Sequence, residues 1–245
     1  PMPSINNTNY DGSFPQRYYI QPGQEYSDPR NPGYYNEEED IDYGLLHEIG
    51  HQLGIIDLYQ MDVPGTANEV NSEGYYSQPG LMHGCSPFIS QHTALAMNNW
   101  HGKRRGFFGQ YLYDIPTTNK IRVLSAEGLP VPNANITIYE FIHTTSGKRI
   151  PNVPKFTGKT DSNGLYTIPN ALLSENWRFW SDTGNVLNDN PFGYVWCIGI
   201  NCVFLIKMEK EGKIDYEWLD ITNFNIAYWQ GNVNEATYDI HSSFY

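Results

Sequence analysis

Two periodicities divide the chain, a helical one near residue 50 and an extended one after about residue 120. In the first, apolar side chains recur on one face and predict a helix that ends at Gly54. We expect that face to anchor the helix in a core, and it comprises Leu45, Leu46, Ile49 and Leu53. His47 and His51 project to the opposite side, about 40° apart, so both imidazoles face one cleft.

The second periodicity predicts short strands. The run NITIYEF, residues 135–141, places Ile136 and Ile138 on one face and Asn135 and Thr137 on the other, as in a half-buried strand. The runs TDSNGLYTI, GYVWCIG, CVFLIKME and FNIAYWQG continue this series. So many short strands favour a β-sandwich.

Two segments of the first half add smaller elements. Residues 1–35 are rich in Asn, Pro, Gly and Tyr and predict coil, with one short strand near residues 17–21. Ser86 followed by Pro87 indicates a helix start, and that helix should run from about Ile89 to Trp100.

The run HEIGHQLGIID, residues 47–57, carries the candidate chemistry. His47 and His51 stand four apart on a helix, the spacing at which two imidazoles bind one Zn²⁺, and Glu48 between them is placed to accept a proton from metal-bound water. Chain reversal at Gly54 brings Asp57 back as a third ligand. The sequence therefore predicts a zinc site with His47, His51 and Asp57 as ligands and Glu48 as general base.

The extended motif, His-Glu-x-x-His-x-x-Gly-x-x-Asp, resembles the metzincin metallopeptidases, and the aspartate is similar to that of immune-inhibitor-A-like and snapalysin-type secreted members. The resemblance covers residues 44–101 and implies that Met82, between Gly80 and Gly84, forms the Met-turn beneath the metal. Many members carry a tyrosine two residues after this methionine, where this chain has Gly84. His83, Tyr59, Tyr75 or Tyr76 is either a substitute for it or an ordinary surface side chain.

The resemblance implies a multidomain α+β fold. Residues 1–115 would form a helical, loop-rich, metzincin-like zinc-binding lower subdomain. Its upper subdomain would either lie upstream, in a longer protein, or be missing. Residues 116–245 would form an all-β sandwich, since IRVLSAEGLPVPNANITIYEF and GKTDSNGLYTIPN resemble immunoglobulin-like or carboxypeptidase-regulatory-like modules.

The amino-acid composition limits the kinds of binding partner that we expect. A net charge of -12 and a pI near 4.9 argue against nucleic acid or an anionic membrane surface as a partner. No apolar run is long enough for a membrane span. The acidic, loop-rich composition favours a secreted or cell-surface protein, and Cys197 and Cys202 are close enough in sequence to form a disulfide.

Alternatives remain at two points. The run NEEEDID, residues 36–42, is either a solvated segment that caps the following helix through Asp40 or Asp42, or a Ca²⁺ site. For function, we expect a secreted zinc metallopeptidase, an endopeptidase that acts on protein or peptide substrates. The alternative is a non-catalytic structural or adhesive surface protein whose peptidase-like fold a metal stabilises.

Overall fold

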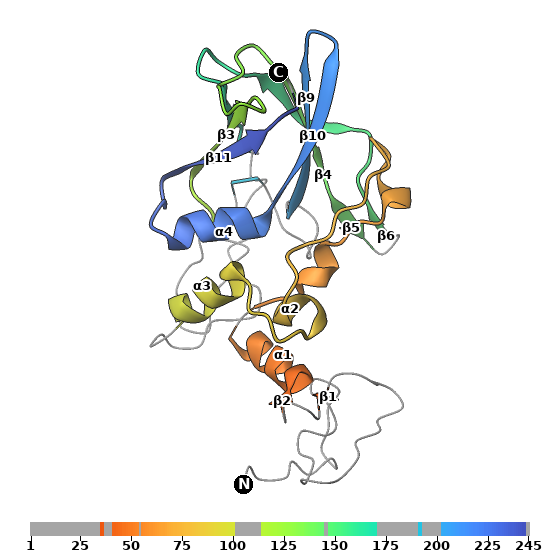
Figure 1. Ribbon diagram of the computed structural model, residues 1–245, viewed down its shortest axis with the longest axis vertical. Coiled ribbons are helices and arrows are strands. Elements are labelled where there is room, and N and C mark those ends of the chain that lie inside the picture. Colours follow the sequence, from red (N-terminus) through yellow and green to blue (C-terminus); the bar gives the residue numbers. More distant parts are fainter. Residues whose placement is uncertain are drawn as a thin grey trace, which may run out of the picture.

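The structure is a computed structural model and describes residues 35–36, 41–53, 55–100, 114–144, 147–170, 191–192 and 202–243. The expected strand at residues 17–21, Gly54 and Cys197 lie outside these residues. The α-helices are α1 (Tyr43–Gln52), α2 (Leu81–Gly84), α3 (Gln91–Trp100) and α4 (Ile221–Trp229), and the 3-10 helices are η2 (Leu58–Met61) and η3 (Gly65–Ala67). Figure 1 shows α1, α2 and α3 at one end of the molecule and the larger sheets at the other.

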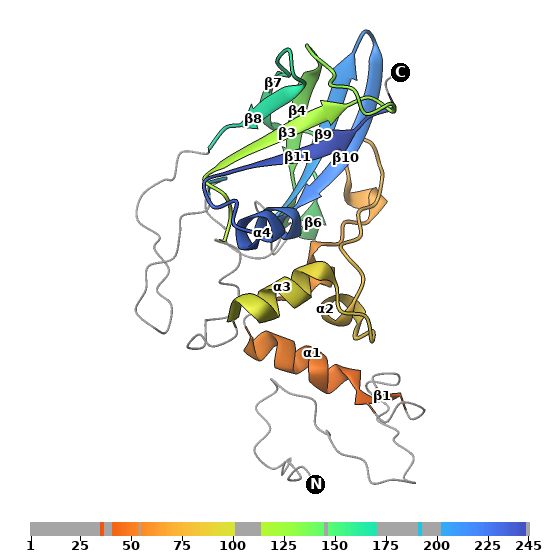
Figure 2. The same ribbon diagram turned by 60° about the vertical axis from the view of Figure 1, so that its left-hand side comes forward.

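Two larger sheets form the strand-rich end. One is antiparallel with the order β10-β9-β4-β7, formed by β4 (Asn135–Glu140), β7 (Pro154–Lys159), β9 (Val203–Lys210) and β10 (Lys213–Asp220). The other has the order β11-β3-β8, formed by β3 (Thr118–Leu124), β8 (Leu165–Ile168) and β11 (Glu235–His241). In it β11 runs parallel to β3, and β8 runs antiparallel to β3 (Figure 2).

Two further pairs of strands are short and antiparallel: β1 (Tyr35–Asn36) with β2 (Ile41–Asp42), and β5 (Ile142–Thr144) with β6 (Gly147–Arg149). Side chains of both larger sheets are fully buried in one apolar cluster, for example Ile121 of β3, Ile138 of β4 and Ile206 of β9. In β3 alternate residues are buried, as the period of a strand requires, whereas β9 buries residues 203–206 in succession.

This architecture corrects the expected fold class. The described chain is rich in sheet, its α-helices have only 4, 9 or 10 residues, and they do not form a helical metzincin-like lower subdomain. A physical reason lies in the turn-rich segment after α1, where Pro, Gly and Asn favour 3-10 turns and the Val63–Tyr75 bridge over longer helices. The domain boundary near residue 115 stays a prediction.

The second half is not all-β either, because α4 separates β10 from β11. The run FNIAYWQG, predicted as a strand, lies largely in this helix. Asp220 caps α4, since its Oδ1 accepts from Thr222 N at 2.8 Å, while Asn223 Oδ1 accepts from Asp220 N at 3.0 Å. This capping box satisfies the first amides of the helix and outweighs the strand preference of the residues that follow.

Buried polar groups join the two ends of the molecule. The Tyr75 hydroxyl donates to the Asp220 carboxylate, and the Tyr75 ring lies 5.0 Å from that of Trp218. Between α3 and α4, His92 Nε2 and Asn225 Oδ1 are 3.3 Å apart, and both side chains are fully buried. Buried polar groups contribute favourably only when they are paired, so these contacts fix how α3 and the preceding loop meet the strand-rich end.

Candidate metal centre

Helix α1 presents both histidines on one face. Asp42 begins the helix by accepting from Leu45 N at 2.8 Å, which confirms that this residue of the NEEEDID run is a cap. Residues 37–40 of that run lie outside the described residues, so the Ca²⁺ alternative stays untested. The rings of His47 and His51 are 4.7 Å apart, edge to face.

The expected apolar anchor of α1 is wrong in part. Leu46 and Ile49 are 39% and 43% exposed, whereas Gly44, His47 and Gly50 are buried. The helix packs against α2 at Gly50, where the lack of a side chain leaves room for Met82.

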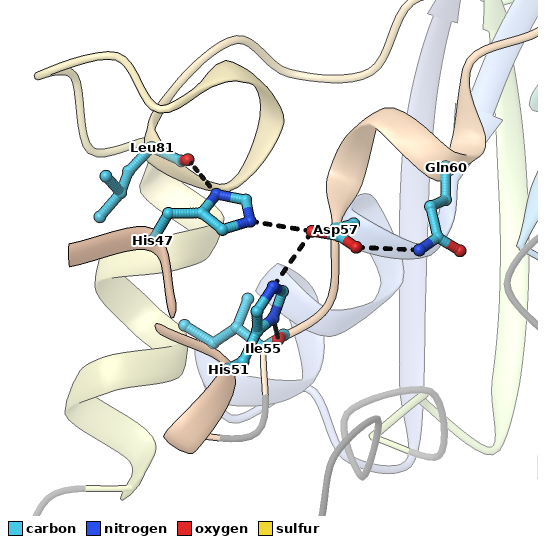
Figure 3. A network of polar contacts seen from close by, with 6 residues as sticks. All are labelled: His47, His51, Ile55, Asp57, Gln60 and Leu81. Carbon is cyan, nitrogen blue, oxygen red and sulfur yellow. Dashed lines mark hydrogen bonds and ion pairs between the residues drawn. The ribbon is translucent and has the colours of Figure 1, made fainter. Parts of the chain in front are cut away.

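Backbone carbonyls fix the orientation of both imidazoles (Figure 3). His47 Nδ1 donates to Leu81 O at 2.7 Å, and His51 Nδ1 donates to Ile55 O at 2.7 Å. A carbonyl oxygen can only accept, so each Nδ1 carries a proton, and a neutral ring then has its lone pair on Nε2. This arrangement is the usual one for a metal-binding histidine, whose second nitrogen is held by a hydrogen-bond acceptor.

Asp57 lies where the two Nε2 atoms converge. Its Oδ1 is 2.9 Å from His47 Nε2 and 3.1 Å from His51 Nε2, and its Oδ2 accepts from Gln60 Nε2 at 2.9 Å. Tetrahedral zinc with bonds of about 2.05 Å would separate its ligand atoms by about 3.3 Å. Both Asp57 distances are close to that separation, so the three donors are compatible with a metal ion.

Burial and pairing determine the charges of these groups. Burial alone would lower the pKa of His47, but its hydrogen bonds, chiefly to Asp57, raise the pKa to about 10. Burial would raise the pKa of Asp57, yet the hydrogen bonds from His47 and His51 hold it well below its usual range. The carboxylate is therefore ionised at neutral pH, as a metal ligand must be.

Glu48 is the second carboxylate of the centre. Ligand atoms of His47, Glu48 and His51 lie within 4.8 Å of one another, a group of donors able to hold a metal ion. Asp57 makes the shorter contacts, so it is the better candidate for third ligand, which leaves Glu48 beside the pair. In the described part of the chain, the half-buried Glu48 carboxylate has no hydrogen-bond or ion-pair partner.

Met82, expected to form a Met-turn, packs against Gly50 of α1, and its role as a Met-turn stays a prediction. It belongs to α2, it is fully buried, and a Cβ on Gly50 would stand only 2.4 Å from its sulfur. Gly80, with φ +147°, precedes this helix, and Cys85, with φ +53°, ends it. Helix α2 therefore packs against α1 through Met82, and it supplies the Leu81 carbonyl that holds His47.

Of the four residues considered as substitutes for the missing tyrosine, only Tyr59 adjoins the centre. It is 44% exposed and lies close enough to Asp57 to help lower the pKa of that carboxyl. His83 pairs with Asp62 at 2.9 Å, Tyr75 is bound to Asp220, and Tyr76 is 73% exposed. Sequence reasoning missed Gln60 and the Ile55 and Leu81 carbonyls; only the position of Gln60, three residues after Asp57, offered a signal.

No protein-family model and no curated protein matches the chain. Among solved structures, it is similar to the dioxygenase domain of a dioxygenase carbohydrate-binding protein fusion from Streptomyces sp. SirexAA-E, with 11% identity over 54% of this chain and 81% of that chain, and a TM-score of 0.27. It is also similar to catechol 1,2-dioxygenase from Acinetobacter sp. ADP1 (12%, 51% of each chain, 0.24) and to transthyretin from Sparus aurata (14%, 52% and 90%, 0.25).

These comparisons contradict the expected enzyme class. The similar structures include dioxygenases and a transthyretin, and we correct the assignment as a zinc metallopeptidase accordingly. Likenesses this distant give no ground for assigning a dioxygenase activity to the chain. What the described residues do provide is a donor group for a metal ion. None of the described helices is long and apolar enough to cross a membrane.

Proposed function

We propose that His47, His51 and Asp57 bind one divalent metal ion and that the centre hydrolyses an acyl substrate with Glu48 as general base. The observation that carries the proposal is the convergence of both Nε2 atoms on Asp57 Oδ1, at 2.9 and 3.1 Å, with both Nδ1 atoms held by carbonyls. Two imidazoles and a carboxylate favour zinc, whose catalytic sites use three protein ligands and keep a fourth position open.

In this proposal each residue of the centre has a separate role. The bound ion would lower the pKa of a water molecule and polarise the substrate carbonyl. Glu48, whose carboxylate makes no hydrogen bond or ion pair with the described residues, would take the proton of that water and return it to the leaving group. Gln60 and the two backbone carbonyls would hold the ligands in place, so little reorganisation is needed when an ion enters.

A matched set of variants tests this proposal. Glu48→Gln should keep the metal, because the amide is nearly isosteric, and should lower hydrolysis by about 10²- to 10⁴-fold. Asp57→Ala should lose both metal and activity. Metal content of protein prepared without chelator and hydrolysis of an unfolded protein and of an activated ester give the two readouts. Equal hydrolysis by wild type and Glu48→Gln would refute the general-base role.

A second candidate is a structural metal site in a non-catalytic surface protein. This candidate is favoured because α1, the Asp57 segment and α2 meet at the centre. One bound ion would cross-link α1 to the Asp57 segment. In that case zinc should raise the unfolding temperature of wild type and Glu48→Gln equally, while neither hydrolyses any substrate tested. Substantial hydrolysis by wild type alone would exclude a purely structural site.

Location and partners belong to the proposal as well. The net charge of -12 supports an extracellular place of action and a polypeptide partner rather than nucleic acid. Cell fractionation with an antibody against the chain would show whether it leaves the cytoplasm.

A further inference from the structure

Strand β11 is the outer strand of its sheet in the described chain and pairs with β3 alone. Ser242 N donates to Leu124 O at 2.8 Å, and Asn234 O accepts from Thr118 N at 2.9 Å, so even-numbered residues direct their backbone groups towards β3. Successive residues of a strand direct these groups to opposite sides. The N–H and C=O of Thr237, Asp239 and His241 therefore face away from the sheet.

Acidic side chains protect the nearby edge of β10, whereas the described residues leave the edge of β11 uncovered. Tyr216 N donates to Asp215 Oδ1 at 2.9 Å, and Trp218 N donates to Glu217 Oε1 at 3.0 Å, so acidic side chains occupy the outward amides of β10. Within the described residues, the outward amides of β11 make no hydrogen bond. An unprotected edge is a template for another strand.

Two clefts flank this open edge. One, of about 310 Å³, lies between β10 and β11 and is lined by Trp218, Tyr238 and Ile240 among others. The other, of about 530 Å³, lies at the start of β11 and shares Asn223 and Tyr238 with the first. Together they provide space beside β11, and the amides that line the larger one, Gln78, Gln91, Gln230 and Asn232, can bond to a peptide backbone.

We propose that an extended peptide segment carrying a Lys or Arg pairs antiparallel with the edge of β11. Antiparallel pairing is slightly more stable per residue than parallel pairing, and strand addition is a common mode of peptide recognition. The charge of the cleft selects the side chain. Glu235 and Asp239 are paired with Lys120 and Arg122, whereas no cation pairs with Glu217 in the described residues.

The same charges disfavour a second copy of this chain as the occupant. Two β11 edges in contact would bring two cleft carboxylates and two chains of net charge -12 together, and like charges close to one another are destabilising. The carboxylate that repels a second copy would attract a basic peptide.

The probe is a short fluorescein-labelled peptide of alternating Thr and Val with one central Lys, titrated with the full chain by fluorescence anisotropy. Thr237→Pro removes one outward N–H and places a ring at the edge, yet leaves the β3 ladder intact, since Thr237 does not bond to β3. It should weaken binding about tenfold or more, whereas Thr237→Val, which keeps the N–H, should bind like wild type. Replacing the Lys of the peptide by Glu should also weaken binding, and less so with Glu217→Gln protein.

A second measurement does not depend on folding of the proline variant. The same peptide, N-methylated at alternate residues, should lose binding to wild type, because methylation removes its backbone donors. Equal binding of the methylated peptide, equal binding to Thr237→Pro, or no binding at 1 mM peptide would each overturn the proposal. So would a wild-type dimer in sedimentation velocity that Thr237→Pro converts to monomer, which would assign the edge to a second copy.

Discussion

Gly50→Ala tests the packing of α1 against α2 at the metal centre. Gly50 stands between His47 and His51 on α1, and a Cβ there would lie 2.4 Å from Met82 Sδ and 3.0 Å from Met82 Cε. Both separations are well below van der Waals contact, so the Met82 side chain would have to retreat. Met82 adjoins Leu81, whose carbonyl holds His47, and a shift of α2 would loosen that hydrogen bond.

The structure sets the size of the effect. Alanine gains about 1 kcal/mol over glycine inside a helix, but overpacking costs about 1 to 3 kcal/mol, so Gly50→Ala should destabilise the protein by about 1 kcal/mol. In a Met82→Ala background the clash is absent and only the helix gain remains. The same substitution should then stabilise by about 1 kcal/mol, which gives a coupling energy of about 2 kcal/mol between the two positions.

Urea unfolding of wild type, both single variants and the double variant, all in chelator, measures this coupling. Zinc titration of wild type and Gly50→Ala should show a loss of affinity of about tenfold, the usual cost when the partner of a liganding histidine is disturbed. If Gly50→Ala changes stability equally in both backgrounds, Met82 does not contact Gly50, and the inferred packing of α2 against α1 is wrong.

Three further outcomes are expected. Asp57→Asn should weaken zinc binding by at least about tenfold in a competition assay with a chromogenic chelator, and unchanged affinity would mean that another residue is the third ligand. Burial lowers the pKa of His92 to about 4, against 6.5 in the unfolded chain, although its hydrogen bond to Asn225 opposes the shift. Because the unfolded state binds the extra proton, the free energy of unfolding should fall by about 3 kcal/mol as pH drops from 6.5 to 4. Urea unfolding of His92→Gln should show a smaller fall over the same pH range. An equal fall in wild type and His92→Gln would refute the assignment to His92. Tyr75→Phe leaves the buried Asp220 with one donor fewer and should cost about 1 to 3 kcal/mol in thermal unfolding, with Tyr76→Phe, on an exposed ring, as the neutral control.

Local signals in the sequence predicted the pieces that depend on local geometry. The four-residue spacing places His47 and His51 on one face of any helix, and the strand period correctly predicted β4 with Ile136 and Ile138 buried. The outer face of α1 was predicted wrongly because apolar periodicity identifies a face without identifying its partner. Here α1 packs against α2 at Gly50, and Ile49 stays exposed.

Non-local and competing signals account for the other errors. Helix α4 was predicted as a strand because its Ile, Tyr and Trp favour strands, whereas the capping box at Asp220 and Asn223 decides for a helix. The anchors of the imidazoles escaped prediction for a different reason. Leu81 O lies 34 residues from His47, and the identity of an amino acid says nothing about where its carbonyl points.

Because backbone carbonyls orient both imidazoles, some mutations near the centre should be tolerated better than others. A carboxylate that orients a histidine is lost in one substitution, but every amino acid has a carbonyl, so no replacement at position 55 or 81 removes the acceptor itself. Substitution of these side chains should therefore leave the orientation of the two rings unchanged. Insertions, deletions and substitutions at Gly80, whose φ of +147° few other residues adopt, should disturb it. Random mutagenesis of the centre should accordingly recover inactive variants at the ligands and in the length of the 55–81 loop, and few among side-chain replacements at the anchors.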